Sequence, residues 1–393
     1  MTIHFLQNIF EKSINGEWGN EDSGNGEATA VIRTSNFLNS GRLNLDNIVC
    51  RDIDKNKNSD KILRTGDIII EKSGGSPNQP VGRVVYFDVT DQDYFTNNFT
   101  SILRVKPRYN SKYIFYLMKY LYDTKKVLKF QNQTTGIINL KLADYLNKTK
   151  VNIETIENQN TIVDILDRLE YQIINRNKQL SEFSNLVKSR FNEMFGDIFD
   201  TTFPIYRLEE LCEFIKDGTH QTPQYTDDRT NGFKFLSSKD VTSGKISWDN
   251  IKYITESLHN ELYAKISPRR NDILLAKNGT TGIAALVDCD EIFDIYVSLA
   301  ILRFYDGNNP TYLLYAINSD TTKWQFESNL KGVGVPNLHL REIRKTKIPL
   351  PPLSLQNEFA EFVAQVDKSQ LAIQKSLEEL ETLKKSLMQE YFG

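Results

Sequence analysis

The 393-residue sequence contains a tandem internal repeat, and this repeat constrains the fold more than any other feature. TGIINLKL (135–142) aligns with VGVPNLHL (333–340) at an offset of 198 residues. KSRFNEMFG (188–196) aligns with KSLMQEYFG (385–393), and Gln159-Asn160 with Gln356-Asn357, both at an offset of 197. Matching segments that keep their order at a nearly constant offset predict two halves with the same fold.

The two halves share one plan, a mixed globular part followed by a long helix. TGDIIIEKSG (65–74) resembles RNDILLAKNG (270–279), which pairs Asp67 with Asp272 and Lys72 with Lys277. The residue patterns predict strands at 67–70, 82–87 and 101–105, long loops at 73–80 and 217–232, a helix over 111–130, and a counterpart helix after Pro310. The fold class expected is therefore α+β, with two mixed α/β domains.

Heptad patterns predict the two long helices. Apolar residues recur every seven positions from Glu157 to about Phe195 and again near the end of the chain, at Leu166, Ile173, Leu180 and Val187, then Val366, Ile373, Leu380 and Leu387. Such a seam favours a partner helix, and the simplest partner is the other copy, antiparallel or parallel. The domain limits expected are 1–156 and 197–353 for the globular parts and 157–196 and 354–393 for the helices.

Composition excludes several classes of protein. No run of eighteen apolar residues or signal-peptide pattern is visible, and the three cysteines are isolated, so the expectation is a cytoplasmic protein without a membrane span, disulfide or metal site. The net charge of −3 argues against strong non-specific nucleic-acid binding but allows local basic surfaces.

Catalytic motifs are absent from the sequence. It contains no P-loop, HExxH motif, zinc-finger spacing or EF-hand loop, and no [DN]PP[YF] tetrapeptide of amino-methylating enzymes. Asp67 with Glu71 and Lys72 could suggest a nuclease site. However, Ala276 stands in the place of Glu71 in the second half, which favours a structural role for Asp67 and Asp272. We therefore expect a protein that is not an enzyme.

Polar groups suited to reading bases gather in three regions of each half. The candidate DNA-binding residues are Lys72, Ser73, Asn78, Lys277, Asn278, Thr280 and Thr281 in the first region, Gln133, Thr134 and Lys331 in the second, and Arg33, Ser35, Lys216, Thr219, His220, Gln221, Ser238 and Lys239 in the third. Candidate phosphate contacts are Lys125, Lys126, Lys129, Arg341, Arg344, Lys345 and Lys347. The alternative is that these are ordinary solvated side chains.

Several segments together resemble the type I restriction–modification specificity subunits. They are KIPLPPLSLQNEFAEFVAQVDK (347–368), the heptad helix that ends in KKSLMQEYFG, and LLAKNGTTG, GVPNL and DGTHQTP in the second globular part. In the first half Ile138 replaces Pro336, and DGTH (217–220) has no clear counterpart.

This resemblance implies two target recognition domains separated by two antiparallel helices that form a coiled-coil spacer. Each domain would read one half of a bipartite, asymmetric site in double-stranded DNA. Two copies of an adenine methyltransferase subunit would dock on the chain, and motor-nuclease subunits could join them. S-adenosylmethionine, ATP and Mg would belong to those partners, so no cofactor is expected here.

A mechanical consequence follows from the helix length. About 38 helical residues at roughly 1.5 Å each span about 57 Å, which corresponds to about 17 base pairs of DNA. The helix pair would then fix the gap between half-sites. A second reading stays open from the residues alone, a coiled-coil scaffold with two protein-binding heads and no DNA.

Overall fold

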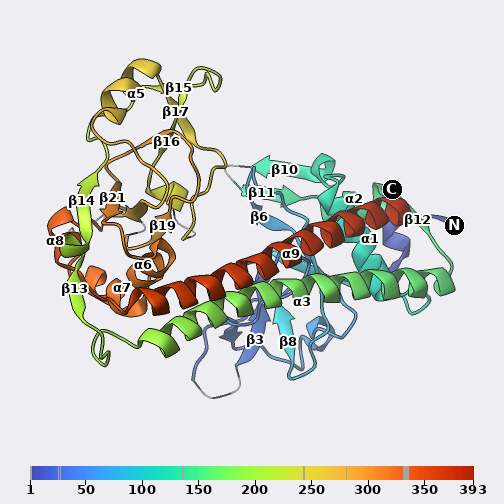
Figure 1. Ribbon diagram of the computed structural model, residues 1–393. Coiled ribbons are helices and arrows are strands. Elements are labelled where there is room, and N and C mark those ends of the chain that lie inside the picture. Colours follow the sequence, from blue (N-terminus) through green and yellow to red (C-terminus); the bar gives the residue numbers. More distant parts are fainter. Residues whose placement is uncertain are drawn as a thin grey trace. The chain divides into compact units, whose positions relative to one another are not determined.

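The computed structural model describes residues 2–24, 26, 28–134, 137–241, 244–279, 281–330 and 336–393. The chain divides into two units (Figure 1). The first comprises Met1–Asn177 together with Lys375–Gly393, and the second comprises Lys178–Gln374. Each unit thus contains one globular part and a portion of both long helices.

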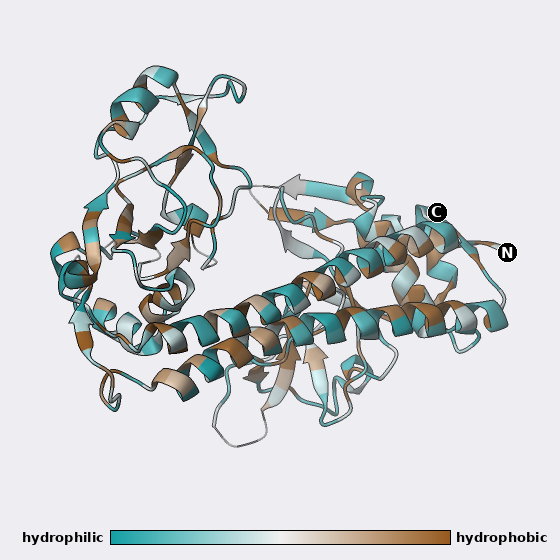
Figure 2. Cartoon of the chain, viewed as in Figure 1, coloured by the Kyte–Doolittle hydropathy of each residue, from teal (hydrophilic) through white to brown (hydrophobic). Residues whose placement is uncertain are grey.

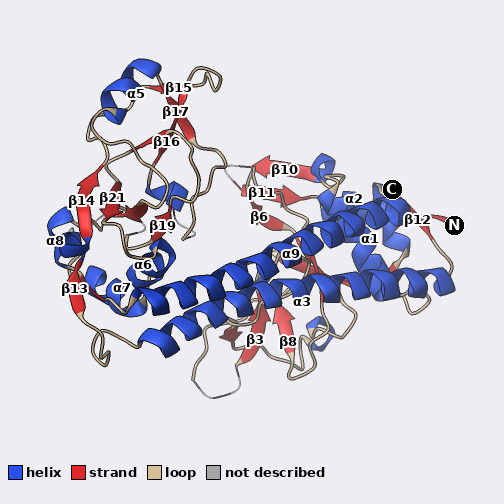
Figure 3. Cartoon of the chain, viewed as in Figure 1, coloured by secondary structure: helices blue, strands red, loops and turns tan. Residues whose placement is uncertain are grey.

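Both units mix helices and strands, as Figure 3 shows by colour. The first unit has strands β1 (Thr2–Phe5), β2 (Phe10–Asn15), β3 (Thr29–Ile32), β4 (Val49–Arg51), β5 (Ile68–Glu71), β6 (Ser73–Gly75), β7 (Val84–Tyr86), β8 (Tyr94–Thr96), β9 (Thr100–Val105), β10 (Gln131–Thr134), β11 (Ile137–Leu140) and β12 (Lys150–Ile153), with helices α1 (Ser111–Asp123) and α2 (Leu142–Lys148). The second has strands β13 (Ile205–Arg207), β14 (Cys212–Asp217), β15 (Tyr225–Thr226), β16 (Phe233–Leu236), β17 (Lys252–Ile254), β18 (Ile273–Ala276), β19 (Ala284–Leu286), β20 (Phe293–Ile295), β21 (Leu299–Phe304) and β22 (Lys347–Pro349), with helices α4 (Leu208–Leu211), α5 (Glu256–Tyr263), α6 (Pro310–Ile317), α7 (Asp320–Glu327) and α8 (Leu340–Lys345). The long helices are α3 (Ile156–Phe195) and α9 (Leu353–Phe392).

The sheets of the two units have matching topology. In the first unit a four-stranded sheet has the order β2-β9-β5-β7, and in the second the order is β14-β21-β18-β19. A second sheet in each unit contains one parallel pair, β3 with β8 and β16 with β20. A short antiparallel pair closes each globular part, β1 with β12 and β13 with β22. The two halves therefore fold alike, as the repeat predicts.

Buried β-branched and aliphatic side chains explain why these segments form central strands. β5 (IIIE) and β18 (ILLA) are buried along their full length, as expected for strands covered on both faces. In each unit one face of the sheet that contains β5 or β18 packs toward the long helices through α1 or α6, and its other face packs against the second sheet. Figure 2 shows brown, apolar residues alternating with teal, polar ones along the two long helices.

The long helices confirm the heptad prediction. The predicted seam residues are all buried or partly buried, whereas most residues between them are exposed. In the first unit Lys384 pairs with Glu170, and in the second Arg190 pairs with Glu358 at 3.2 Å. The early part of α3 thus meets the late part of α9, and the reverse holds in the second unit, which is the pairing order of antiparallel helices.

A repeated glutamine–asparagine pair ties each long helix to its globular part. Gln159 Oε1 accepts a hydrogen bond from the Asn110 backbone N–H at 2.9 Å, and its Nε2 donates to the Glu154 carbonyl at 2.8 Å. Gln356 bonds the Asn309 N–H and the Pro351 carbonyl, each at 2.8 Å. Asn110 and Asn309 are the N-caps of α1 and α6, so one amide fixes two helices in each unit.

Some sequence-based boundaries were wrong. The helix expected over 111–130 ends at Asp123, because Lys125 adopts a left-handed φ of 60° that stops the helix. Its counterpart after Pro310 is two short helices, α6 and α7. The expected loop 73–80 begins with strand β6, and the loop 217–232 contains the short strand β15. Few residues in these strands are β-branched, so the sequence pattern did not reveal them.

Candidate DNA interface

A lysine at the end of a central strand organises the site in the first unit. Lys72 follows β5, and its carbonyl accepts a hydrogen bond from the Leu140 N–H at 2.7 Å. The next residue, Ser73, pairs with Asn139 across β6 and β11, and its Oγ donates to Asn139 Oδ1 at 2.6 Å. Ser73 of the first candidate region and Gln133 and Thr134 of the second therefore belong to one three-stranded sheet, β10-β11-β6.

The second unit repeats this framework with different side chains. The Lys277 carbonyl accepts from the Leu338 N–H at 2.8 Å, and Asn278 forms a β-bridge with Asn337. The Oδ1 atoms of Asn278 and Asn337 are buried without a hydrogen-bond partner among the described residues. Buried acceptors are normally satisfied, so a donor for each of these two oxygens is expected from beyond the described residues.

The two lysines differ in what faces their ammonium groups. Lys72 Nζ donates to the neutral amide oxygen of Asn15 at 2.8 Å. Lys277 Nζ, in a side chain only 7% exposed, donates to the carboxylate of Asp217 at 2.9 Å. Burial lowers the pKa of Lys72. Burial alone would raise the pKa of Asp217, but the hydrogen bond and charge of Lys277 outweigh it and leave that pKa lowered.

The third candidate region forms an equivalent turn in both units. Asn36 Oδ1 accepts from the Arg33 N–H at 2.9 Å, and Asp240 Oδ2 accepts from the Ser237 N–H at 2.7 Å. In the second unit the Ser238 N–H donates to Ser298 Oγ at 3.0 Å, and the Ser298 carbonyl accepts from the Lys277 N–H. The third region therefore adjoins the lysine site in that unit.

The remaining candidates fall into three groups. Ser35, Asn78, Lys216, His220, Gln221 and Lys239 are exposed, whereas Arg33, Thr219, Ser238 and Thr281 are partly buried. Gln133 and Thr134 lie on β10, where only their backbone is described, and Thr280 and Lys331 lie outside the described residues. His220 Nε2 lies 3.1 Å from Asp217 Oδ2, and Gln221 Nε2 donates to Glu261 Oε1 at 3.4 Å.

The candidate phosphate contacts are exposed cations in both units. Lys126 and Lys129 lie over the rings of Tyr120 and Phe130, at 5.2 and 5.1 Å from the centroids. Arg344 donates to the Ile215 carbonyl at 2.9 Å, which holds one guanidinium nitrogen against β14.

Sequence reasoning missed the counterpart of the Asp217-Gly218 dipeptide in the first half. The register of β2 with β9, and of β14 with β21, places Asn15-Gly16 at this position. A Cβ on Gly16 would lie 2.0 Å from the Asn97 carbonyl oxygen, and one on Gly218 would lie 2.1 Å from that of Ile295. Both positions therefore require glycine. The sequence did contain a signal for this match. In each half an Asp or Asn followed by a glycine stands at the end of the first long strand.

The carboxylates that could suggest a nuclease have structural partners. Asp67 accepts two hydrogen bonds from Arg104, and Glu71 accepts two from Arg83. In the described part of the chain no group of three His, Cys, Asp or Glu side chains could hold a metal ion. Likewise, none of the described helices is long and apolar enough to cross a membrane.

Two α+β domains of matching topology, each with a polar edge beside a buried or partly buried lysine and each joined to a long helix, define a protein with a duplicated domain. The family model described as "Type I restriction modification DNA specificity domain" matches residues 2–182 and again residues 201–383. The chain belongs to this family, in two copies of the domain.

Individual relatives agree with the family match. The chain is 26% identical over 297 residues to the type I restriction enzyme MjaVIII specificity subunit of Methanocaldococcus jannaschii, an alignment that covers 70% of this chain and 68% of the relative. It is 21% identical over 235 residues to the EcoBI specificity subunit of Escherichia coli, covering 58% and 46% of the two chains.

Solved structures share the fold over the full length. The type I restriction–modification S subunit from M. genitalium has a TM-score of 0.56 and 15% identity, covering 100% of this chain and 96% of the other. A chain from a study of complex assembly and conformational transition in the type I R-M system has a TM-score of 0.57 and 16% identity, covering 99% and 96%.

Proposed function

We propose that this chain is the DNA-reading subunit of a type I restriction–modification complex. Each globular domain reads one half of a bipartite, asymmetric site in duplex DNA. The observation that carries this proposal is that one backbone framework occurs twice with different polar groups on it. An asparagine occupies the same position in both, Asn139 and Asn337, but its cross-strand partner is Ser73 in the first framework and Asn278 in the second. Equal frameworks with unequal hydrogen-bonding groups suit two different half-sites.

The long helices are proposed to set the spacing between the two globular domains and to provide the docking surface for partner subunits. Their seam supports an antiparallel coiled coil that carries the globular domains at residues 1–156 and 197–353. Two methyltransferase subunits are proposed to dock on the chain, and motor-nuclease subunits can join them. S-adenosylmethionine, ATP and Mg then belong to those subunits, and this chain contributes recognition without catalysis.

The alternative, a scaffold with two protein-binding heads, has no support from the family match. Two observations separate the two proposals. The first is the mobility of labelled duplex DNA with the chain alone and with its co-expressed methyltransferase. The second is modification-sensitive sequencing of DNA from cells with and without the gene. We expect a bipartite motif whose methylation requires this chain. Absence of sequence-dependent DNA binding and of such a motif would contradict the proposal.

The assignment of one half-site to each domain needs its own experiment. We expect Ser73→Ala with Asn139→Ala to relax one half of the motif only, and Asn278→Ala with Asn337→Ala to relax the other half only. Each pair serves as the matched control for the other. Relaxation of both halves by either pair would contradict the assignment.

A further inference from the structure

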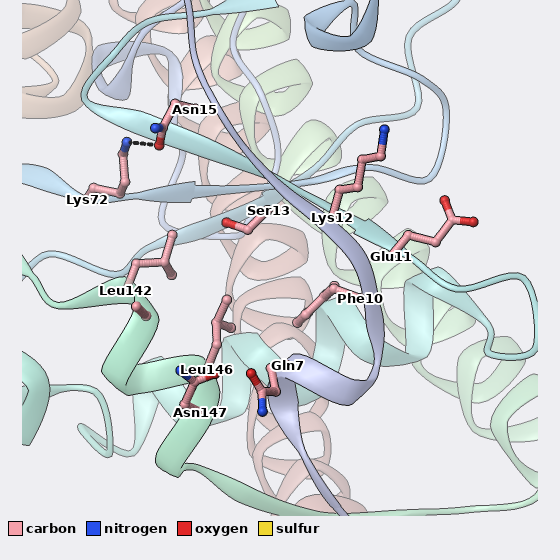
Figure 4. A pocket seen from close by; sticks show the side chains of 11 residues that line it. Gln7, Phe10, Glu11, Lys12, Ser13, Asn15, Lys72, Leu142, Leu146 and Asn147 are labelled. Carbon is pink, nitrogen blue, oxygen red and sulfur yellow. Dashed lines mark hydrogen bonds between the residues drawn. The ribbon is translucent and has the colours of Figure 1, made fainter.

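A groove of about 410 Å³ lies beside Lys72 in the first unit (Figure 4). Residues of β2 line one wall, and Leu142, Leu146 and Asn147 of α2 line the other. Lys72 and Asn15 lie together at one end, joined by their hydrogen bond. Figure 4 shows Glu11 at the opposite end, pointing away from Lys72.

Lys72 is a partly buried cation without a counter-ion. None of the ion pairs among the described residues includes Lys72, and its hydrogen-bond acceptor is the neutral amide of Asn15. Removing an ammonium group from water is costly unless a negative charge offsets the loss, and the lowered pKa of Lys72 has this cause. An anion placed in the groove would supply that charge.

In the second unit the corresponding lysine, Lys277, has a counter-ion within the chain. Asp217 stands where Asn15 stands in the first unit, and its carboxylate neutralises Lys277. The wall of the groove differs as well. Arg344 reaches across to the Ile215 carbonyl, whereas Asn147, at the aligned position 197 residues earlier, has a side chain too short for that contact. The lysine is thus uncompensated in the first unit and neutralised by a carboxylate in the second.

We propose that the Lys72 groove binds a backbone phosphate of duplex DNA, and that Lys277 makes no such contact because Asp217 neutralises it within the protein. This inference rests on the proposed function and adds an asymmetry to it: the first domain holds the DNA backbone at a position where the second does not.

The decisive variant is Asn15→Asp, which gives the first unit the counter-ion of the second without changing side-chain size. The Ser101 hydroxyl that donates to Asn15 Oδ1 at 3.2 Å keeps an acceptor, so we expect the variant to retain the fold. Each phosphate neutralised by a cation contributes about −0.9 to the slope of log affinity against log salt. We expect Asn15→Asp to reduce the magnitude of that slope by about 0.9.

Three further variants make the result specific. Asn152→Asp, an exposed residue of β12, adds the same charge elsewhere and should leave the slope nearly unchanged. Lys72→Met should reduce the slope as Asn15→Asp does. With Lys72→Met in place, adding Asn15→Asp should reduce it no further, because the positive charge that the new carboxylate would neutralise is gone.

The measurement uses the full chain assembled with its methyltransferase, on target duplex and on scrambled duplex. If wild type prefers the target but Asn15→Asp behaves like Asn152→Asp, the phosphate site is wrong and the proposed function stands. If wild type shows no preference, the proposed function itself fails. Thermal unfolding of the same variants with and without inorganic phosphate tests whether the groove binds a free anion instead. If phosphate stabilises the wild-type fold but not Asn15→Asp, while the salt dependence of DNA affinity is the same for both, the groove binds a free anion and the inference is overturned.

Discussion

The carboxylate of Asp67 accepts two hydrogen bonds from the guanidinium of Arg104, from Nε at 2.9 Å and from Nη2 at 2.8 Å. Asp272 and Arg303 form the same bidentate pair at 2.8 and 2.7 Å. Each carboxylate also accepts from a backbone N–H three residues earlier, Arg64 or Arg269. The turn before the central strand and the neighbouring strand are thus fixed by one buried ion pair in each unit. This confirms the structural role expected for Asp67 and Asp272.

Breaking one such pair should destabilise one unit. Removing one partner leaves a buried charge uncompensated, which costs about 3–5 kcal/mol. We expect Asp67→Asn to lower the free energy of unfolding of the first unit by this amount and Asp272→Asn to do so for the second. Hydrogen exchange of the amides in β5 and β18 measures each unit separately. Equal loss of protection in both units from either substitution would contradict the assignment.

The first unit has a second buried ion pair at a position where the second unit has two apolar residues. The ion pair can therefore be replaced by the apolar residues of the other unit. Glu71 pairs with Arg83 in the first unit, while backbone pairing places Ala276 and Ile283 at these positions in the second. We expect Glu71→Ala alone to lower the free energy of unfolding by about 3–5 kcal/mol, because the Arg83 guanidinium stays buried without its counter-ion. The double variant Glu71→Ala with Arg83→Ile should recover most of this loss. A double-mutant cycle by urea unfolding tests it, and additive losses would contradict the expectation.

The sequence could predict those parts of the fold that depend on regular apolar spacing. The seam from Leu166 to Val187 implied a helix because its period does not depend on tertiary contacts. β6 and β10 were not predicted, since SGG and QNQT gain their strand conformation from pairing with β11 rather than from intrinsic preference.

The candidate site was predictable only in part for a related reason. Lys72 and Lys277 were among the candidate residues, and the repeat aligns them. Asn139 and Asn337 are aligned by the same repeat but were not among those candidates. The contact of Lys72 with Asn15 joins residues 57 positions apart, and no sequence period encodes it. The difference between Asn15 and Asp217 could therefore be interpreted only after the strand register was known.

The buried glutamines should connect each long helix to its own globular part. Replacing Gln356 by leucine would leave the Asn309 N–H and the Pro351 carbonyl without their hydrogen-bond partner. Each unsatisfied group would lower the stability of the folded state by about 1–3 kcal/mol. We expect Gln356→Leu to increase hydrogen exchange at the start of α6 and to leave α1 unchanged. Gln159→Leu is the matched control with the opposite pattern. Increased exchange in both helices from one substitution would show that the two junctions are coupled.

The Asp217–Lys277 pair predicts a pH dependence of known sign. The pKa of Asp217 is lowered in the folded protein, so its contribution to stability is complete above its ordinary pKa of 3.8 and is lost as the pH falls through the lowered value. We expect wild type to be more stable than Asp217→Asn at neutral pH, with the difference shrinking below about pH 4. Urea unfolding at several pH values measures it. A difference that grows on acidification would contradict this assignment.

The proposed spacer function predicts the effect of lengthening the helices. A heptad inserted in α3 after Asn177, with another in α9 after Gln374, keeps the apolar seam in phase, because the pattern repeats every seven residues. Seven helical residues add about 10 Å, close to three base pairs at 3.4 Å each. Methylation mapping should therefore show unchanged half-site sequences separated by a gap longer by about three base pairs. An insertion of two residues in each helix is the control, since it rotates the apolar seam by about 200° and should disrupt helix pairing. Altered half-site sequences in the heptad variant would contradict the spacer function of the long helices. A spacer changes the distance between the half-sites without changing the sequence that each domain reads.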